Sequence, residues 1–587
     1  MNVGVAQGSN LGPILFLIFV NDLPDYLPEV KIIQFVDDTT IEIDSHDIEY
    51  IPELSRASQS RALEWFSANG LSMNPEKTQN MMFSLRDKGE HLSQVPTVGF
   101  LGLQLDASLT WGAHVDGLSS TLIEKIIICF SIPSNLNRLK RIKETKEMQQ
   151  LRSIQGIRFF NMVLVISCHH IMITFVGPVS NTNFLETLTD KFENIFFASG
   201  GYAVQTFFVI SAWLLSYHVL LIFENEKKLR LKTLFWIFIN RYVRLTPTLA
   251  VVIGLHATLM KFAPRGPFWD HIVGEDYRNC RSNGWTNLLY INNYVNPKNM
   301  CMQQTWYLAA DTQLFILGLF IMALLKKRRN NIKLILSVCL IIGIALPGIL
   351  AYWNSSDILI RAYPETIYRS YLQDENWHLL FSSGYSNIGA YIIGIIFGYL
   401  YYSNRFENIP TTRIFRVLWY ISTFGLGLTI IGISYPMYQN SYVYSKLSSA
   451  IYWSFGRNIF SLAIAIGIFG MTRKLGRLCH RICSWTPFVV LGRLTYSAYL
   501  IHVLILRIRA SSLMYPIYVD RYLFAIGTIG DAATTYIFAF LVCLLLEMPI
   551  SALQKLWIPQ KIKEEKKLSN GSTFPMIKID SVDKEGV

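Results

Sequence analysis

An arginine and a histidine eleven residues apart, Arg158 and His169, lie in the apolar segment GIRFFNMVLVISCHHIMITF. Eleven residues turn a helix about 20° past three full turns and advance it about 16 Å, so both side chains share one face. A histidine can act as general base on an acceptor hydroxyl near neutral pH. The pair therefore suits a long donor with an anionic head at Arg158 and its reactive end at His169, which is the shape of acyl-CoA. Alternatively, His169 forms a hydrogen bond within a bundle and Arg158 reaches to lipid headgroups.

From residue 157 onward, the composition and the apolar runs predict membrane-spanning helices, among which this pair would lie. Of the 587 residues, 51% are hydrophobic and 16% are charged, whereas about a quarter of a soluble protein is charged. Apolar runs of about 18 to 22 residues are long enough to cross the hydrocarbon core. We expect an all-α polytopic membrane bundle of about ten transmembrane helices, at roughly 157–178, 199–222, 243–262, 305–325, 333–352, 386–402, 414–434, 453–471, 486–506 and 523–546.

Basic clusters between these runs predict the orientation of the bundle. With ten spans they all fall on one side, at 137–152, 224–232, 326–329, 472–481 and 560–567. Basic loops are retained in the cytoplasm, so we expect both termini to be cytoplasmic and the loops 263–304 and 353–385 to lie outside. The net charge of +12 is then a topology signal and does not indicate a nucleic-acid partner. The expected location is the endoplasmic reticulum or the plasma membrane.

Two cysteines, Cys280 and Cys301, are the only pair that shares a predicted exterior loop. An oxidising compartment would favour a disulfide between them, and two free thiols are the alternative. Cys479 and Cys483 flank His480 but have no fourth ligand nearby. We therefore expect no functional metal site.

Several segments in the membrane half carry a family resemblance. They are FSIPSNLNRL (130–139), SIQGIRFFNMVLVISCHH (153–170), VQTFFVISAWLL (204–215), NRYVRLTP (240–247), NLLYINN (287–293), WYLAADTQLF (306–315), SNIGAYIIGIIFGYL (386–400), LGRLTYSAYLIH (491–502) and LEMP (546–549). Over about 126–550 the chain resembles the acyltransferase 3 family, in particular its nose-resistant-to-fluoxetine branch. The resemblance implies transfer of an acyl group from cytosolic acyl-CoA to a hydroxyl or amine acceptor, with Arg158 and His169 as the catalytic pair. Gln205 and Ala212 depart from the pattern, which usually has an acidic or small polar residue and a glycine there.

The same resemblance assigns substrate-binding residues. Arg241 and Arg244 match a basic element of the family and share a helix face, so they could clamp CoA phosphates; ordinary cytoplasmic flanking is the alternative. His502 matches a family histidine. Asp311 could pair with an arginine, stabilise an imidazolium or position the acceptor, or simply join helices.

Two neighbouring residues are expected to lie outside this site. Arg493, nine residues before His502, should point to nearly the opposite face of one helix. His170 points about 100° away from His169 and is expected to serve packing.

The polar N-terminal stretch has a different character. QGSNLGPILFLIFVNDLP (7–24), FVDD (35–38), WFSANGLSMNPEKTQNMMF (65–83) and VGFLGLQLD (98–106) resemble a non-long-terminal-repeat retrotransposon reverse transcriptase over about 1–122. Asp37 and Asp38 would be two of its metal ligands, but two-metal chemistry needs a carboxylate cluster. The third aspartate would belong to a strand ahead of residue 1. We therefore expect a partial, inactive α+β palm fragment, joined near residue 125 by splicing or by gene prediction.

The predicted domains are the reverse transcriptase fragment at 1–122, a basic cytosolic linker at 123–156, the multi-pass acyltransferase at 157–548 and a polar cytosolic tail at 549–587. The expected partners are membrane lipid, acyl-CoA as donor and a lipid, sterol, carbohydrate or protein acceptor, with no tightly bound cofactor. A non-enzymatic transporter or lipid-handling protein on the same bundle is the alternative function. RNA-directed DNA polymerase activity of residues 1–122 is a remote one.

Overall fold

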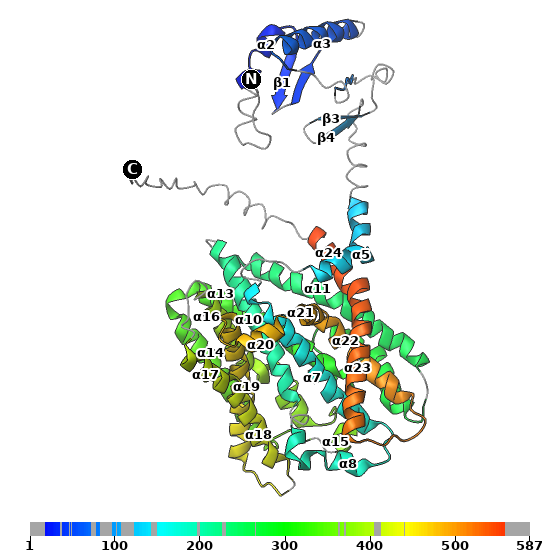
Figure 1. Ribbon diagram of the computed structural model, residues 1–587, viewed down its shortest axis with the longest axis vertical. Coiled ribbons are helices and arrows are strands. Elements are labelled where there is room, and N and C mark those ends of the chain that lie inside the picture. The colour runs from blue at the N-terminus through cyan, green and yellow to red at the C-terminus, as the bar shows by residue number, and fades with distance from the viewer. Residues whose placement is uncertain are drawn as a thin grey trace, which may run out of the picture. The chain divides into compact units, whose positions relative to one another are not determined.

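The computed structural model divides the chain into two units, Met1–Lys125 and Ile126–Val587 (Figure 1). It describes residues 18–35, 38–45, 47, 50–71, 78–82, 97–100, 103–106, 122–141, 149–195, 200–225, 230–263, 266–361, 364–368, 371–403, 412–439 and 441–557.

The described residues of the first unit form two antiparallel strand pairs and two helices. Its elements are α2 (Leu23–Tyr26), β1 (Lys31–Phe35), β2 (Asp38–Glu42), α3 (Ile51–Ala68), β3 (Thr97–Phe100) and β4 (Leu103–Asp106). The sheets are β1–β2 and β3–β4. A small core forms where Ala62 and Trp65, one turn apart on α3, pack against Leu23 and Leu27. Asp37 and the side chain of Asp38 lie outside the described residues, so the structure does not locate the two predicted metal ligands.

The second unit is a helical bundle, as the sequence predicts. Within the described part of the chain, eight helical segments are long and apolar enough to cross a membrane. They contain α7 (Ser153–Val176), α10 (Gly201–Asn225), α11 (Leu231–Thr258), α13 (Trp306–Lys327), α14 (Ile332–Trp353), α17 (Arg413–Tyr420) with α18 (Leu426–Tyr438), α19 (Lys446–Thr472) and α23 (Arg521–Val542) with α24 (Met548–Trp557). A bent pair, α21 (Thr486–Arg493) and α22 (Thr495–Ser511), makes a ninth if it counts as one span.

The sixth predicted span, 386–402, is the shorter helix α16 (Ile388–Ser403). Its 16 residues extend about 24 Å, less than the roughly 30 Å of a hydrocarbon core. Close packing against α10 accounts for its position: a Cβ at Gly394 would lie 2.6 Å from Val209 O, and one at Gly398 2.6 Å from Trp213 O. Such small residues let helix backbones approach closely in membrane bundles.

Gln205 and Ala212, the two departures from the family pattern, lie on the part of α10 that packs against α16 and the residues just before it. A Cβ at Gly394 would lie 2.6 Å from the Cβ of Ala212. Gln205 Nε2 donates a hydrogen bond of 2.9 Å to Asn387 Oδ1, just before α16 begins. Both residues are therefore accommodated by packing.

The expectation of one continuous helix over 486–506 is wrong. α21 and α22 meet at an angle of 68°. Arg493, at the end of α21, donates hydrogen bonds to the carbonyl oxygens of Leu139 and Arg141. These bonds hold α5 (Ile132–Lys140) on the bundle, and they direct Arg493 to the end of α5.

Helix α7 is central to the bundle because it packs against α10, α19, α20 (Arg477–Cys483), α21, α22 and α23 (Figure 1). Glycines permit two of these contacts. A Cβ at Gly156 would lie 2.1 Å from Cys483 O, and a Cβ at Gly492 would lie 2.0 Å from Gln155 O. The helix that carries Arg158 and His169 is therefore held by backbone contact near its first turn.

We predict that Gly156→Ala lowers the stability of the bundle, because the added methyl group meets backbone that cannot move aside. Overpacking of this kind costs about 1–3 kcal/mol, measurable as a lower thermal unfolding midpoint in detergent. The matched control is Gly254→Ala in α11, where a Cβ meets nothing within 4 Å. That substitution should stabilise by about 0.5–1 kcal/mol. Equal effects of the two substitutions would contradict the packing described for α7.

Candidate active site

Two histidines from different helices meet inside the bundle. The rings of His169 on α7 and His502 on α22 have centroids 4.9 Å apart and an interplanar angle of 81°. His169 Nδ1 is 2.9 Å from Val165 O, and His502 Nδ1 is 2.7 Å from Tyr499 O. A carbonyl oxygen only accepts hydrogen bonds, so each Nδ1 carries a proton and donates it. Each neutral ring then has Nε2 as its basic nitrogen.

A pocket opens beside His169. Its other lining residues are aliphatic or polar: Met172, Ile173, Val176, Gln303, Gln304, Ile367, Val503 and Arg507. Among the described residues, the side-chain nitrogen and oxygen of Gln304, His502 Nε2 and Arg507 Nε are buried without a hydrogen-bond partner. Buried polar groups are normally paired. Those of Gln304 and Arg507, which line the pocket, are therefore available to a bound substrate.

A second group of predicted site residues forms an arginine cluster. Arg241 makes an ion pair with the buried carboxylate of Asp311. Arg158 lies within electrostatic range of Arg244, Arg241 and Asp311, and Arg244 is exposed. Of the roles considered for Asp311, the structure gives it the arginine pairing. The cluster keeps more positive than negative charge and can hold an anion.

The predicted residues therefore divide into two sites. His169 and His502 form one, and Arg158, Arg241, Arg244 and Asp311 form the other. Arg158 and His169 are eleven residues apart on α7, which separates them by about 16 Å along the helix axis.

Sequence reasoning missed a buried ion cluster that begins at His170, the residue after His169. His170, which the sequence suggested was a packing residue, has Nδ1 2.5 Å from Asp531 Oδ2. Arg509 Nε lies 3.0 Å from Asp531 Oδ1. An aspartate inside the apolar run 523–546 is itself a signal of function or pairing. The cluster ties α7, α22 and α23 together.

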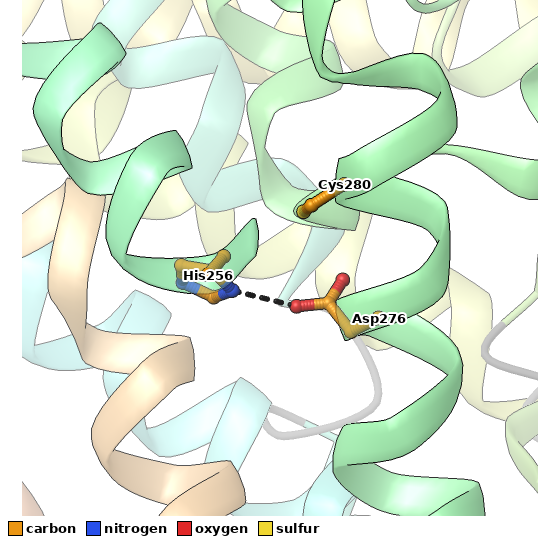
Figure 2. Close-up of side chains that lie close together, drawn as sticks. All are labelled: His256, Asp276 and Cys280. Carbon is orange, nitrogen blue, oxygen red and sulfur yellow. Dashed lines mark hydrogen bonds and ion pairs between the residues drawn. The ribbon is translucent and has the colours of Figure 1, made fainter. Parts of the chain in front are cut away.

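Another missed cluster surrounds Asp276 on α12 (Glu275–Leu288). Figure 2 shows His256 pointing at this carboxylate, with Nδ1 2.7 Å from Asp276 Oδ2. Arg507 Nη1 is 3.8 Å from Asp276 Oδ1, which also accepts the Met302 N–H at 3.1 Å. Burial opposes ionisation of this carboxyl, but Arg507 and His256 hold the pKa of Asp276 well below its usual range.

Cys280 lies one turn after Asp276 and completes a set of three potential metal ligands (Figure 2). Its sulfur is joined to Cys301 in a disulfide, and a disulfide sulfur is not a thiolate ligand. Asp276 is already engaged with His256, Met302 and Arg507. The set therefore fits a disulfide-anchored ion cluster better than a metal site.

Comparisons with known proteins divide at the same place as the structure. A family model described as an acyltransferase domain matches residues 151–548, and a model described as reverse transcriptase (RNA-dependent DNA polymerase) matches residues 1–105. Both resemblances found in the sequence are confirmed.

Among curated proteins, nose resistant to fluoxetine protein 6 of Caenorhabditis elegans is 26% identical over 460 residues, covering 73% of this chain and 54% of that protein. Regulator of hypoxia-inducible factor 1 of the same organism is 27% identical over 215 residues, covering 35% of this chain and 40% of that protein. The RNA-directed DNA polymerase from mobile element jockey of Drosophila funebris is 31% identical over 145 residues, covering 22% of this chain and 15% of that protein. The chain thus spans about half the length of the first relative. No solved structure matches it significantly.

We predict that Asp276→Asn destabilises the protein at neutral pH, because Arg507 loses its buried counter-ion. Breaking a buried pair costs about 3–5 kcal/mol. The lowered pKa sets the pH dependence: the stabilisation is complete above about pH 4, the ordinary value for aspartate. It is lost as pH falls below that value toward the lower pKa of the folded state.

Thermal unfolding midpoints at neutral pH and below pH 4 measure this. The difference between wild type and Asp276→Asn should shrink on acidification. Asp270→Asn is the matched control, because Asp270 is 74% exposed and pairs with the exposed Arg278. It should change the midpoint little. A pH-independent difference for Asp276→Asn would contradict the ion cluster.

Proposed function

The chain belongs to the acyltransferase 3 family through residues 151–548, and we propose on that premise that it transfers an acyl group from acyl-CoA to a hydroxyl or amine acceptor. The observation that carries this proposal is the pair of adjacent imidazoles, the partly buried His169 and the buried His502, whose Nδ1 atoms both bind carbonyl oxygens. This leaves the Nε2 atoms as bases. His169 lines the pocket and acts as general base.

The arginine cluster supports an anionic donor. Since Asp311 neutralises Arg241, the remaining charges of Arg158 and Arg244 are available to phosphate groups. Arginine forms bidentate, charge-assisted hydrogen bonds with phosphate. About 16 Å of α7 separates Arg158 from His169, a span that the pantetheine arm of CoA would bridge. The CoA head then binds at the arginine cluster and the thioester lies at His169.

In this proposal the acceptor reaches His169 from the end of the bundle opposite the arginine cluster. A second pocket, lined by residues that include His271, Glu275, Asp276 and Asn279, shares Ile173, Val176 and Arg507 with the His169 pocket. Its α12 residues lie beside the Cys280–Cys301 disulfide. Disulfides persist in oxidising compartments, so we assign this end to the exterior or lumenal side. With the short helix α16 taken as a tenth crossing, the basic clusters and both termini are then cytoplasmic, in the endoplasmic reticulum or the plasma membrane.

In the proposed reaction, His169 takes a proton from the acceptor and passes it to the leaving CoA thiolate. The acceptor hydroxyl or amine gives its proton to His169 Nε2 as its oxygen or nitrogen attacks the thioester carbonyl carbon. The new C–O or C–N bond forms, and the C–S bond breaks. The CoA thiolate then takes the proton from the His169 imidazolium. His502 Nε2 holds the acceptor group beside His169.

Transport or lipid handling is a second candidate, favoured by the two pockets that share three lining residues. This candidate predicts binding of acyl-CoA without transfer. Measuring both binding and transfer in the same preparation separates it from the acyltransferase proposal.

We predict that His169→Ala lowers acyl transfer by about 100- to 10,000-fold, the usual contribution of a general base. Transfer of radiolabelled acyl groups from acyl-CoA to membrane acceptors measures this. The matched control is His218→Ala: His218 on α10 makes the same hydrogen bond to the carbonyl four residues earlier, Leu214 O, but is exposed. Full transfer by His169→Ala would refute the role of this histidine, and wild-type binding without transfer would favour the transporter.

A further inference from the structure

The proposed reaction needs a donor for the negative charge that develops on the acyl carbonyl oxygen. Stabilising such an oxyanion is usually the largest single contribution to catalysis of acyl transfer. Arg158 cannot supply it, because eleven residues place it about 16 Å along α7 from His169. The donor must therefore come from the other residues that line the His169 pocket.

Gln304 is one such donor. Its side chain is 3% exposed, and neither its amide nitrogen nor its amide oxygen has a partner in the described part of the chain. Its backbone is fixed, since Tyr499 OH donates a hydrogen bond of 2.6 Å to Gln304 O. Tyr499 O in turn accepts the Nδ1 proton of His502. A single residue thus fixes both Gln304 and the second histidine.

Arg507 is the other donor. It lies five residues after His502 on α22, is 7% exposed and lines the same pocket as His169. Its charge also lies within electrostatic range of His169. Nη1 donates a hydrogen bond of 2.8 Å to Ile272 O, whereas Nε has no partner within the described ranges.

The Asp276 cluster holds Arg507 in this position. Asp276 Oδ1 is 3.8 Å from Arg507 Nη1, and the carboxylate is fixed in turn by the Met302 N–H and by His256. Figure 2 shows the contact with His256. The Cys280–Cys301 disulfide helps to fix both partners of this hydrogen bond, because Cys280 lies one turn after Asp276 and Cys301 directly precedes Met302. The Cys301–Gln304 segment therefore carries both the Met302 N–H that binds Asp276 and the Gln304 side chain.

We propose that Gln304 and Arg507 bind the acyl carbonyl oxygen beside His169 and stabilise it as an oxyanion, with Asp276 and His256 as positioning residues. This inference rests on the proposed acyl transfer. As the acceptor attacks, the carbonyl π pair moves to the oxygen, where the Gln304 and Arg507 N–H groups donate hydrogen bonds. When the C–S bond breaks, the pair returns to form the new carbonyl and the thiolate leaves. Both donors are buried before the substrate arrives, so they need little reorganisation.

Steady-state kinetics of acyl transfer from acyl-CoA by the full-length protein, with Gln304→Leu and Arg507→Gln, test the proposal. Each should lower kcat about 100- to 1,000-fold, the cost of one oxyanion donor, with little change in KM. Arg507→Lys keeps the charge and should retain more activity than Arg507→Gln. Asp276→Asn should lower kcat in the same direction by a smaller factor, again without raising KM. Arg278→Gln on α12 is the control, because its exposed pair with Asp270 lies outside both pockets.

The results can distinguish a failure of the oxyanion assignment from a failure of the acyltransferase proposal. If His169→Ala abolishes transfer while Gln304→Leu and Arg507→Gln keep wild-type kcat, the oxyanion assignment is wrong and the acyltransferase proposal stands. A raised KM with unchanged kcat would also overturn the assignment, because the two residues would then bind the ground state. Absence of transfer by the wild type would overturn both. Unfolding midpoints of every variant show whether a loss of kcat reflects misfolding.

Discussion

A charged side chain buried between membrane-spanning helices needs a partner within the protein, because hydrocarbon offers neither water nor counter-ions. Three buried aspartates in the helical unit meet this need by pairing with arginines of other helices, as Asp311 with Arg241, Asp276 with Arg507 and Asp531 with Arg509. The pairs join α13 to α11, α12 to α22 and α23 to α22. Electrostatic pairing therefore links helices across the bundle, including α22 and α23, which pack against α7.

The same constraint identifies the groups that are free to react. His170 and His256 each use Nδ1 on an aspartate, whereas His169 and His502 use theirs on backbone carbonyls. The first two are bound to charged partners and serve the scaffold. The second two keep the character of neutral bases inside a low-dielectric bundle. The proposed acyl transfer would use such a base at His169, with the anionic head of the donor bound separately at the arginine cluster.

Much of this arrangement could be predicted from the sequence, because apolar run length and helical periodicity are local properties. They located the helices and placed Arg158 and His169 on α7, and the motifs pointed to Arg241, Asp311 and His502. Periodicity gives the face of a helix but not its neighbour. The Asp276–Arg507 and His170–Asp531 pairs, each more than two hundred residues apart in sequence, therefore escaped prediction. The bend between α21 and α22 and the short α16 depend on tertiary packing, which run length does not encode.

The proposed binding of the donor can be tested with a cryo-electron microscopy structure that contains a non-transferable acyl-CoA analogue, in which a thioether-linked ketone replaces the thioester. We predict CoA phosphates at Arg158 and Arg244, and the carbonyl oxygen within hydrogen-bond distance of Gln304 and Arg507 on the His169 side of the pocket. An analogue whose phosphates bind away from the arginine cluster, or whose carbonyl lies outside the His169 pocket, would contradict the proposal.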